Sequence, residues 1–208
     1  MIQSLPISNL SLYDVEAKFD LKETQDEAFF AEWYQDLLEL TEAERQNLDQ
    51  IKHSFLYLNK SPLAEVAVKM VVLSPLLSMA GFYQPPFRFS TEASVQIVAE
   101  DDGQLFRGRI DVLVLQERFW MLTVESKEAG FSLKQAIAQG LAYMMGTPYP
   151  ERPAFGFATN GSEFRFIKLE QRNVPQYGFS DLFTLQRRQN ELYSVLQIIK
   201  RLGQTLTL

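Results

Sequence analysis

Three charged residues beside two apolar runs are the strongest chemical signal in this sequence. Asp111 stands inside one apolar run, and Glu125 and Lys127 close the next. Side chains alternate along a strand, so Glu125 and Lys127 point the same way, and a turn at residues 116–118 would let Asp111 join them. A buried unpaired carboxylate is costly, and two neighbouring carboxylates repel unless a cation intervenes. The spacing predicts a metal site with a lysine beside it, and a buried ion pair is the alternative.

The composition restricts what such a site can contain. The chain of 208 residues has no cysteine and one histidine, His53, which excludes thiolate and multi-histidine metal sites within it. Oxygen ligands remain, and they suit Mg²⁺ or Mn²⁺. The net charge of −6 argues against a nonspecific nucleic-acid coating protein, but it leaves a nuclease with a local acidic patch open.

The sequence has a globular composition and no membrane signal. Hydrophobic residues make up 46% of it. Residues 1–14 lack the basic and apolar regions of a signal peptide, and the longest apolar tract, residues 66–81, is interrupted by Lys69 and Pro75. We therefore expect a single domain over residues 1–208, located in the cytoplasm.

Residues 1–60 are predicted to form a mostly helical extension. Residues 10–21 alternate loosely and could begin as a strand, and residues 24–40 carry apolar side chains at helical spacing. Thr41 followed by Glu44 is a capping box, so a further helix is expected to begin there.

The predicted core begins with a helix at Ser61-Pro62 that bends or ends at Pro75. Glu65, in its first turn, has two interpretations. It either favours the helix dipole or faces the strand pair and joins the metal shell. Spacing alone favours the first.

The remaining elements are predicted from periodicity and turn signals. A strand is expected over residues 87–99, a helix over residues 132–145, and a hairpin around Asn160-Gly161. One stripe of the helix, either solvated or directed toward the carboxylates, carries Gln135, Gln139 and Tyr143. Residues 170–208 are predicted to be a loop and a final helix over about residues 185–202, with four basic residues as its solvated flanks: Arg187, Arg188, Lys200 and Arg201.

This order of elements and charges resembles the PD-(D/E)xK nuclease superfamily. Ile110-Asp111 stands where the superfamily has Pro-Asp, and Glu125-Ser126-Lys127 corresponds to its E-x-K element. An E-x-K pattern alone is common by chance, and Asp111 one strand earlier makes the match more specific.

Two later motifs narrow the resemblance. Residues 139–143 fit a Q-x-x-x-Y motif on the following helix, and Thr159-Asn160-Gly161 resembles the turn after it. The combination resembles the nuclease domain at the N-terminus of the type I restriction enzyme R subunit, over residues 61–169.

The resemblance implies a fold and an activity. The fold would be α/β, with a restriction-endonuclease-like αβββαβ core, a mixed central sheet flanked by helices, the helical N-terminal extension and the C-terminal helix. The activity would be restriction-type hydrolysis of DNA phosphodiester bonds, dependent on Mg²⁺ or Mn²⁺. Cleavage of both DNA strands would need a homodimer or two sequential nicks, and restriction-modification proteins are the implied partners.

The resemblance also implies a role for each site residue. Asp111, Glu125 and the Ser126 carbonyl would hold the metal, and Lys127 would stabilise and orient the attacking hydroxide. The supporting residues would be Glu65, which completes the shell through water, and Gln139 and Tyr143, which position the site or contact the DNA backbone.

Two other classes of function remain open at this point. The chain could be a catalytically silent nuclease-fold module that binds DNA or docks on a larger restriction assembly. It could also be a structural interaction protein in which Asp111 and Lys127 form an ion pair. No G-x-x-x-x-G-K-[ST] loop occurs in the sequence, so we expect no ATP-driven translocation by this chain alone.

Overall fold

The structure is a computed structural model that describes most of the chain. The described residues are 4–7, 10–61, 63–87, 89–90, 94–99, 104–109, 112–115, 119–123, 133–172 and 174–207. The strands within residues 4–6 and 89–123 are described by their backbone pairing.

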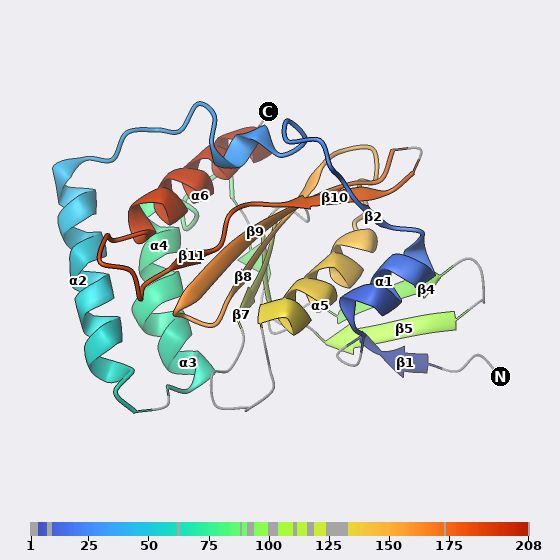
Figure 1. Cartoon of the computed structure of the whole chain (residues 1–208), viewed down its shortest axis with the longest axis horizontal. Coiled ribbons are helices and arrows are strands. Elements are labelled where there is room, and N and C mark those ends of the chain that lie inside the picture. Colours follow the sequence, from blue (N-terminus) through green and yellow to red (C-terminus); the bar gives the residue numbers. More distant parts are fainter. Residues whose placement is uncertain are drawn as a thin grey trace.

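A mixed sheet forms the centre of the protein (Figure 1). Its strands run in the order β2 (Lys22–Glu23), β10 (Gln176–Phe179), β9 (Glu163–Glu170), β8 (Ala154–Thr159), β7 (Phe119–Thr123), β6 (Val112–Leu115) and β3 (Phe89–Ser90), and β11 (Phe183–Thr184) also pairs with β9. The pairs β7–β8 and β2–β10 are parallel, and the others are antiparallel.

The middle of this sheet has the expected restriction-endonuclease-like connectivity. β6 and β7 are antiparallel, with Val112 opposite Leu122 and Leu115 opposite Phe119, so the predicted strand pair is confirmed. Helix α5 (Leu133–Met145) then leads to β8, which is parallel to β7. The predicted hairpin also forms, as the antiparallel pair β8–β9.

A second sheet contains β1 (Ser4–Pro6), β5 (Gln104–Arg109) and β4 (Ser94–Ala99) in that order, and β4 lies near α5. Within the strand expected over residues 87–99 the structure describes two strands, because β3 pairs with β6 while β4 pairs with β5 in the other sheet; residues 88 and 91–93 lie outside the described residues. The segment of β5, QLFRGR, was not singled out because it mixes a glycine and two arginines and lacks an alternating pattern.

Helices cover both faces of the main sheet (Figure 1). One core joins the sheet to α2 (Glu42–Leu58), α3 (Glu65–Val68), α4 (Ser74–Met79) and α6 (Leu192–Thr207), and the other joins it to α1 (Leu12–Phe19) and α5. Side chains alternate along β8, so Phe155 and Phe157 enter the first core, whereas Ala154 and Ala158 enter the second.

Residues 10–21 contain a helix, α1, and the expected strand start there is wrong. The Ser11 hydroxyl accepts a hydrogen bond from the Asp14 N–H at 3.2 Å, and the Asp14 carboxylate accepts one from the Ser11 N–H at 2.9 Å. This capping box satisfies two backbone donors at the helix start, which favours the helix.

Residues 24–40 form turns and a short 3-10 helix, Ala31–Trp33, and the long helix predicted there is absent from them. The Asp26 carboxylate accepts a hydrogen bond from the Ala28 N–H at 2.9 Å, which competes with helical bonding. Lys168 on β9 donates to the Phe29 carbonyl at 2.7 Å. Tertiary contacts therefore override the helical spacing of the apolar residues.

The helix predicted from Ser61-Pro62 begins later and continues past Pro75. It starts as α3 at Glu65, passes through a π-helical turn at Lys69–Leu73 and continues as α4. The Ser74 N–H donates to the Lys69 carbonyl, five residues back. Pro75 then follows at the start of α4, where its missing N–H is tolerated.

The last helix begins at Leu192, after the expected start near residue 185, and Asn190 accepts a hydrogen bond from its first N–H at 3.2 Å. Two basic residues on α6 that were predicted to be solvated are paired. Lys200 Nζ lies 2.6 Å from a carboxylate oxygen of Glu44 on α2, and Arg201 lies 3.6 Å from that of Asp36. α2 itself begins as predicted, with Thr41 and Glu44 forming its capping box, and His53 on it is exposed.

Gly161 in the β8–β9 turn is expected to be intolerant of a side chain. Its φ is +84°, and a β-carbon there would lie 2.7 Å from Val68 Cγ1 of α3. Gly161→Ala should lower the free energy of unfolding by about 2–4 kcal/mol, from the left-handed backbone and the overpacking together.

Gly81 provides the matched control, because its φ is +81° and a β-carbon there meets no atom within 4 Å. Gly81→Ala should lose only about 1–2 kcal/mol. Chemical denaturation of both variants measures the difference, and equal losses would contradict a tight contact between the turn and α3.

Candidate functional site

The residues predicted to carry chemistry, Asp111, Glu125, Ser126 and Lys127, lie outside the described residues. The strands on which they depend are described. Asp111 directly precedes the first residue of β6, and Glu125 comes two residues after Thr123, the last residue of β7. Since β6 and β7 are antiparallel, the start of β6 and the end of β7 lie at the same edge of the sheet.

The turn between β8 and β9 lies at this same edge. Thr123 of β7 pairs with Thr159, the last residue of β8. The Thr159 hydroxyl accepts a hydrogen bond from the Gly161 N–H at 2.8 Å, and the Asn160 side chain accepts two, from the Ser162 and Glu163 N–H groups, at 3.0 and 2.8 Å. These bonds hold the turn in a single compact conformation next to the end of β7.

Helix α3, which Glu65 begins, reaches the same edge. Val68, at the other end of this short helix, contacts the turn at Gly161 closely enough to leave no room for a β-carbon there. Glu65 is one helical turn from Val68 in sequence, so the helix places its backbone near the ends of β7 and β8.

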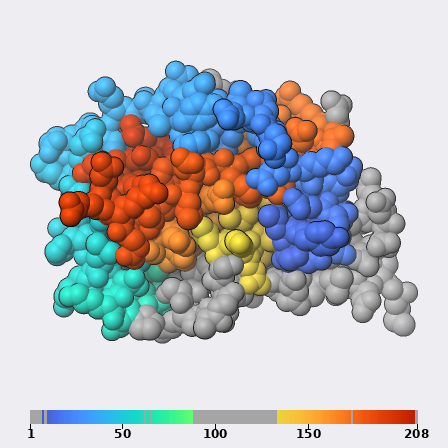
Figure 2. All heavy atoms as spheres, viewed as in Figure 1, coloured from blue at the N-terminus to red at the C-terminus, as the bar shows by residue number. Residues whose placement is uncertain are grey.

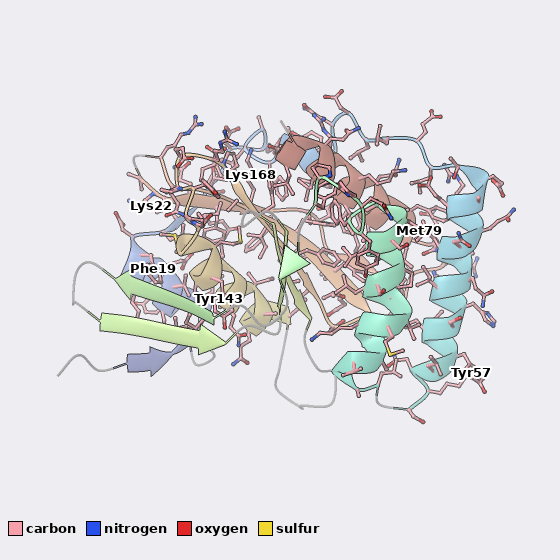
Figure 3. All side chains as sticks on the ribbon, turned by 180° about the vertical axis from the view of Figure 1, so that it is seen from behind. Phe19, Lys22, Tyr57, Met79, Tyr143 and Lys168 are labelled. Carbon is pink, nitrogen blue, oxygen red and sulfur yellow. The ribbon has the colours of Figure 1, made fainter. Side chains whose placement is uncertain are left out.

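Gln139 and Tyr143 are on α5, as predicted, at increasing distance from this edge. α5 begins beyond the end of β7 and returns to the start of β8, so its first residues are nearest the edge. Gln139 is half-buried, and Tyr143 is 3% exposed in the core between the sheet and α1 (Figure 3). Tyr143 is therefore a buried core residue in this structure.

Two charged side chains on β9 were not singled out by sequence patterns. Lys168 is 7% exposed and donates to a Glu32 carboxylate oxygen at 2.8 Å. Arg165 lies against the Phe179 ring, with its guanidinium carbon 4.3 Å from the ring centroid. The signal was available for Lys168, because it interrupts the apolar run of β9, where a charge needs a partner.

The described residues contain no group of three or more His, Asp or Glu side chains that could hold a metal ion. Tyr177 donates a hydrogen bond to the Glu16 carboxylate at 2.7 Å. Burial first, and then this bond, raise the pKa of the Tyr177 hydroxyl above its ordinary range. The pair joins β10 to α1 and has a structural role.

The antiparallel strands β3–β6–β7, the crossover helix α5 and the parallel strand β8 define a restriction-endonuclease-like α/β protein. The family described as "Type I restriction enzyme R protein N terminus" matches residues 13–174, and the chain belongs to this family, whose domain is PD-(D/E)xK nuclease-like. The match begins well before residue 61, so it includes most of the segment that the sequence patterns had treated as an extension.

No curated protein matches the chain. None of the helices in the described part of the chain combines the length and apolar character needed to cross a bilayer.

Proposed function

We propose that the chain is a divalent-metal-dependent endonuclease that hydrolyses DNA phosphodiester bonds. The observation that carries the proposal is the β6–β7 pairing, which brings the segments of Asp111 and Glu125 to one edge of the sheet. Family membership supports the same class of activity.

The register of the described strands supports a common face for the three residues. If the β6–β7 ladder continues by one residue, Asp111 is opposite Thr123. Directly opposed residues share a face, and so do residues two apart along a strand, so Glu125 and Lys127 would follow on the face of Thr123.

That face is the one covered by α3. Thr123 pairs with Thr159, and Thr159 pairs with Phe164. Phe164 belongs to the same core as Val68 of α3 and Phe55 of α2. The helix begun by Glu65 and the three catalytic candidates would therefore share one side of the sheet, which favours Glu65 as a supporting residue over a purely helix-dipole role.

Each residue then has a stated role. Asp111, Glu125 and the Ser126 carbonyl would hold Mg²⁺ or Mn²⁺, because these ions prefer oxygen ligands. When bound, the ion would activate water as a Lewis acid and neutralise charge on the phosphate. Lys127 would donate to the attacking oxygen and orient it toward the phosphorus. Gln139 and Tyr143 would support the site from α5.

Metal dependence is the direct test of this function. Purified protein should convert supercoiled plasmid to nicked or linear DNA with Mg²⁺ or Mn²⁺, and EDTA should stop the reaction. Calcium offers a control, since it can occupy oxygen sites with looser geometry. Cleavage that persists in EDTA would contradict the proposal, and binding to DNA without cleavage in any metal would favour a silent docking module.

A further inference from the structure

A cavity of about 550 Å³ lies on the opposite face of the sheet from the proposed catalytic residues. It is formed by the start of α1, the start of α5 and the strands β9 and β10. Its lining residues are Leu10, Ser11, Leu12, Tyr13, Lys134, Gln135, Ile137, Arg165 and Phe179. In Figure 2 the beginning of α5 (yellow) reaches the surface between α1 (dark blue) and the strands near the C-terminal third (orange).

Arg165 is the side chain that gives this cavity a chemical character. Its Nε donates to the Ser180 carbonyl at 3.3 Å, and its guanidinium stacks on Phe179. These contacts fix the plane of the guanidinium at the cavity wall. Among the residues that the structure describes, no carboxylate lies within ion-pairing distance of it, so its terminal N–H groups are available to a ligand.

The charges around Arg165 differ on its two sides. Glu23 and Asp181 line a separate cavity of about 640 Å³ that also reaches Arg165. Burial lowers the pKa of the Arg165 guanidinium, and these two carboxylates oppose that effect. Arginine side chains stay charged in proteins. In the cavity beside α1 and α5 the second charged lining residue is Lys134. Of the two α1 carboxylates, Asp14 is hydrogen-bonded to Ser11 and Glu16 accepts a hydrogen bond from Tyr177.

Apart from Ser11 and Gln135, the other lining residues are apolar or aromatic. Phe179 and Ile137 line the same cavity as Arg165, and Tyr13, which also lines it, is 77% exposed. A ligand that matches both the basic and the aromatic side chains of the cavity must carry an anionic group for Arg165 and Lys134 and a flat apolar group for the aromatic rings. A nucleotide has this combination, because its phosphate suits a guanidinium fork and its base stacks on aromatic side chains.

We propose that this cavity binds a nucleotide, with the phosphate between Arg165 and Lys134 and the base against Phe179 and Tyr13. The nucleotide could belong to a DNA strand or be free in solution. This binding is separate from nuclease activity, because the cavity would hold a nucleotide without hydrolysing it.

Calorimetric titration in EDTA tests binding separately from cleavage. The probes are thymidine monophosphate, thymidine, inorganic phosphate and 5′-phosphorylated hexathymidylate. Thymidine monophosphate should bind more tightly than thymidine or phosphate alone. If the hexanucleotide binds more tightly still, a DNA strand is the ligand, and if it binds more weakly, a free nucleotide is.

Three variants locate the site. Lys134→Glu should weaken nucleotide binding at least about tenfold, and Arg165→Lys, which keeps the charge but loses the planar fork, several-fold. Lys134 is exposed in the first turn of α5, where glutamate is compatible with the helix, so this variant should fold. Arg172→Glu makes the same charge change at an exposed position beyond the other end of β9 and should leave binding unchanged.

Several results would overturn the proposal. They are no saturable binding of either nucleotide probe, phosphate binding as tight as that of the monophosphate, unchanged binding in Lys134→Glu and Arg165→Lys, or an equal loss in Arg172→Glu. None of these results depends on whether the chain cleaves DNA.

Discussion

Replacement of Asp111 or Lys127 by alanine is expected to reduce metal-dependent DNA cleavage by roughly 100- to 1,000-fold or more. The loss of a charge-stabilising group at a phosphoryl centre removes several kcal/mol from transition-state stabilisation, and each 1.36 kcal/mol is a factor of ten in rate. Initial rates of plasmid nicking at saturating Mg²⁺ measure the effect.

The two variants should fail for different reasons. As a proposed metal ligand, Asp111 should be needed for Mn²⁺ binding, so Asp111→Ala should weaken it in a calorimetric titration as well as reduce cleavage. As the proposed donor to the attacking oxygen, Lys127 should be needed for turnover only, so Lys127→Ala should retain Mn²⁺ binding and lose turnover. This split separates a metal centre from an Asp111–Lys127 ion pair, in which neither variant would change a metal titration.

Glu117→Ala is the matched control for these variants. In the sequence Glu117 falls between Leu115, the last residue of β6, and Phe119, the first of β7, whereas Asp111 precedes β6 and Glu125 follows β7. Like Asp111→Ala, the substitution Glu117→Ala removes a carboxylate, yet it should leave cleavage and metal binding near the wild-type level. Wild-type cleavage by Asp111→Ala in a clean preparation would refute the assignment.

Replacement of Lys168 by methionine is expected to lower the free energy of unfolding by about 3 kcal/mol. Lys168 is buried on β9, and its ammonium group contacts Glu32 at 2.8 Å, Glu170 at 3.3 Å and the Phe29 carbonyl at 2.7 Å (Figure 3). Removing one partner of a buried pair leaves the other charge uncompensated, which costs about 3–5 kcal/mol when burial is complete. Because Glu32 is partly exposed, we expect a loss at the lower end of this range.

Urea denaturation of Lys168→Met, Glu32→Gln and the double variant gives the coupling between the two side chains. The double variant should lose less than the sum of the single losses. Lys52→Met is the control, since Lys52 also bonds backbone carbonyls, those of residues 187–189, but is only half-buried. It should cost less than about 1 kcal/mol. An equal loss in Lys52→Met would contradict a special role for burial.

The strands that flank the candidate site were predictable from the sequence. Asp111, Glu125 and Lys127 are recognisable because charges next to apolar runs need partners, and the expected β6–β7 pair forms. Periodicity alone left the role of Glu65 open, because the packing of α3 on the Gly161 turn is a contact between segments far apart in sequence. Arg165 was missed for the same reason, since its contacts are with Phe179 on β10 and with the Ser180 carbonyl that follows.

The sequence alone determined the features that short-range chemistry controls. The capping box at Thr41 and Glu44 began α2, and Asn160-Gly161 made the β8–β9 hairpin, because each satisfies its own backbone hydrogen bonds within four residues. Tertiary structure decided where competing contacts were available. Residues 24–40 have helical spacing, yet the Lys168 bond to Phe29 and the packing of Phe30 against the sheet hold them in turns. The physical reason is that helix propensity amounts to a few tenths of a kcal/mol per residue, less than one satisfied buried charge contributes.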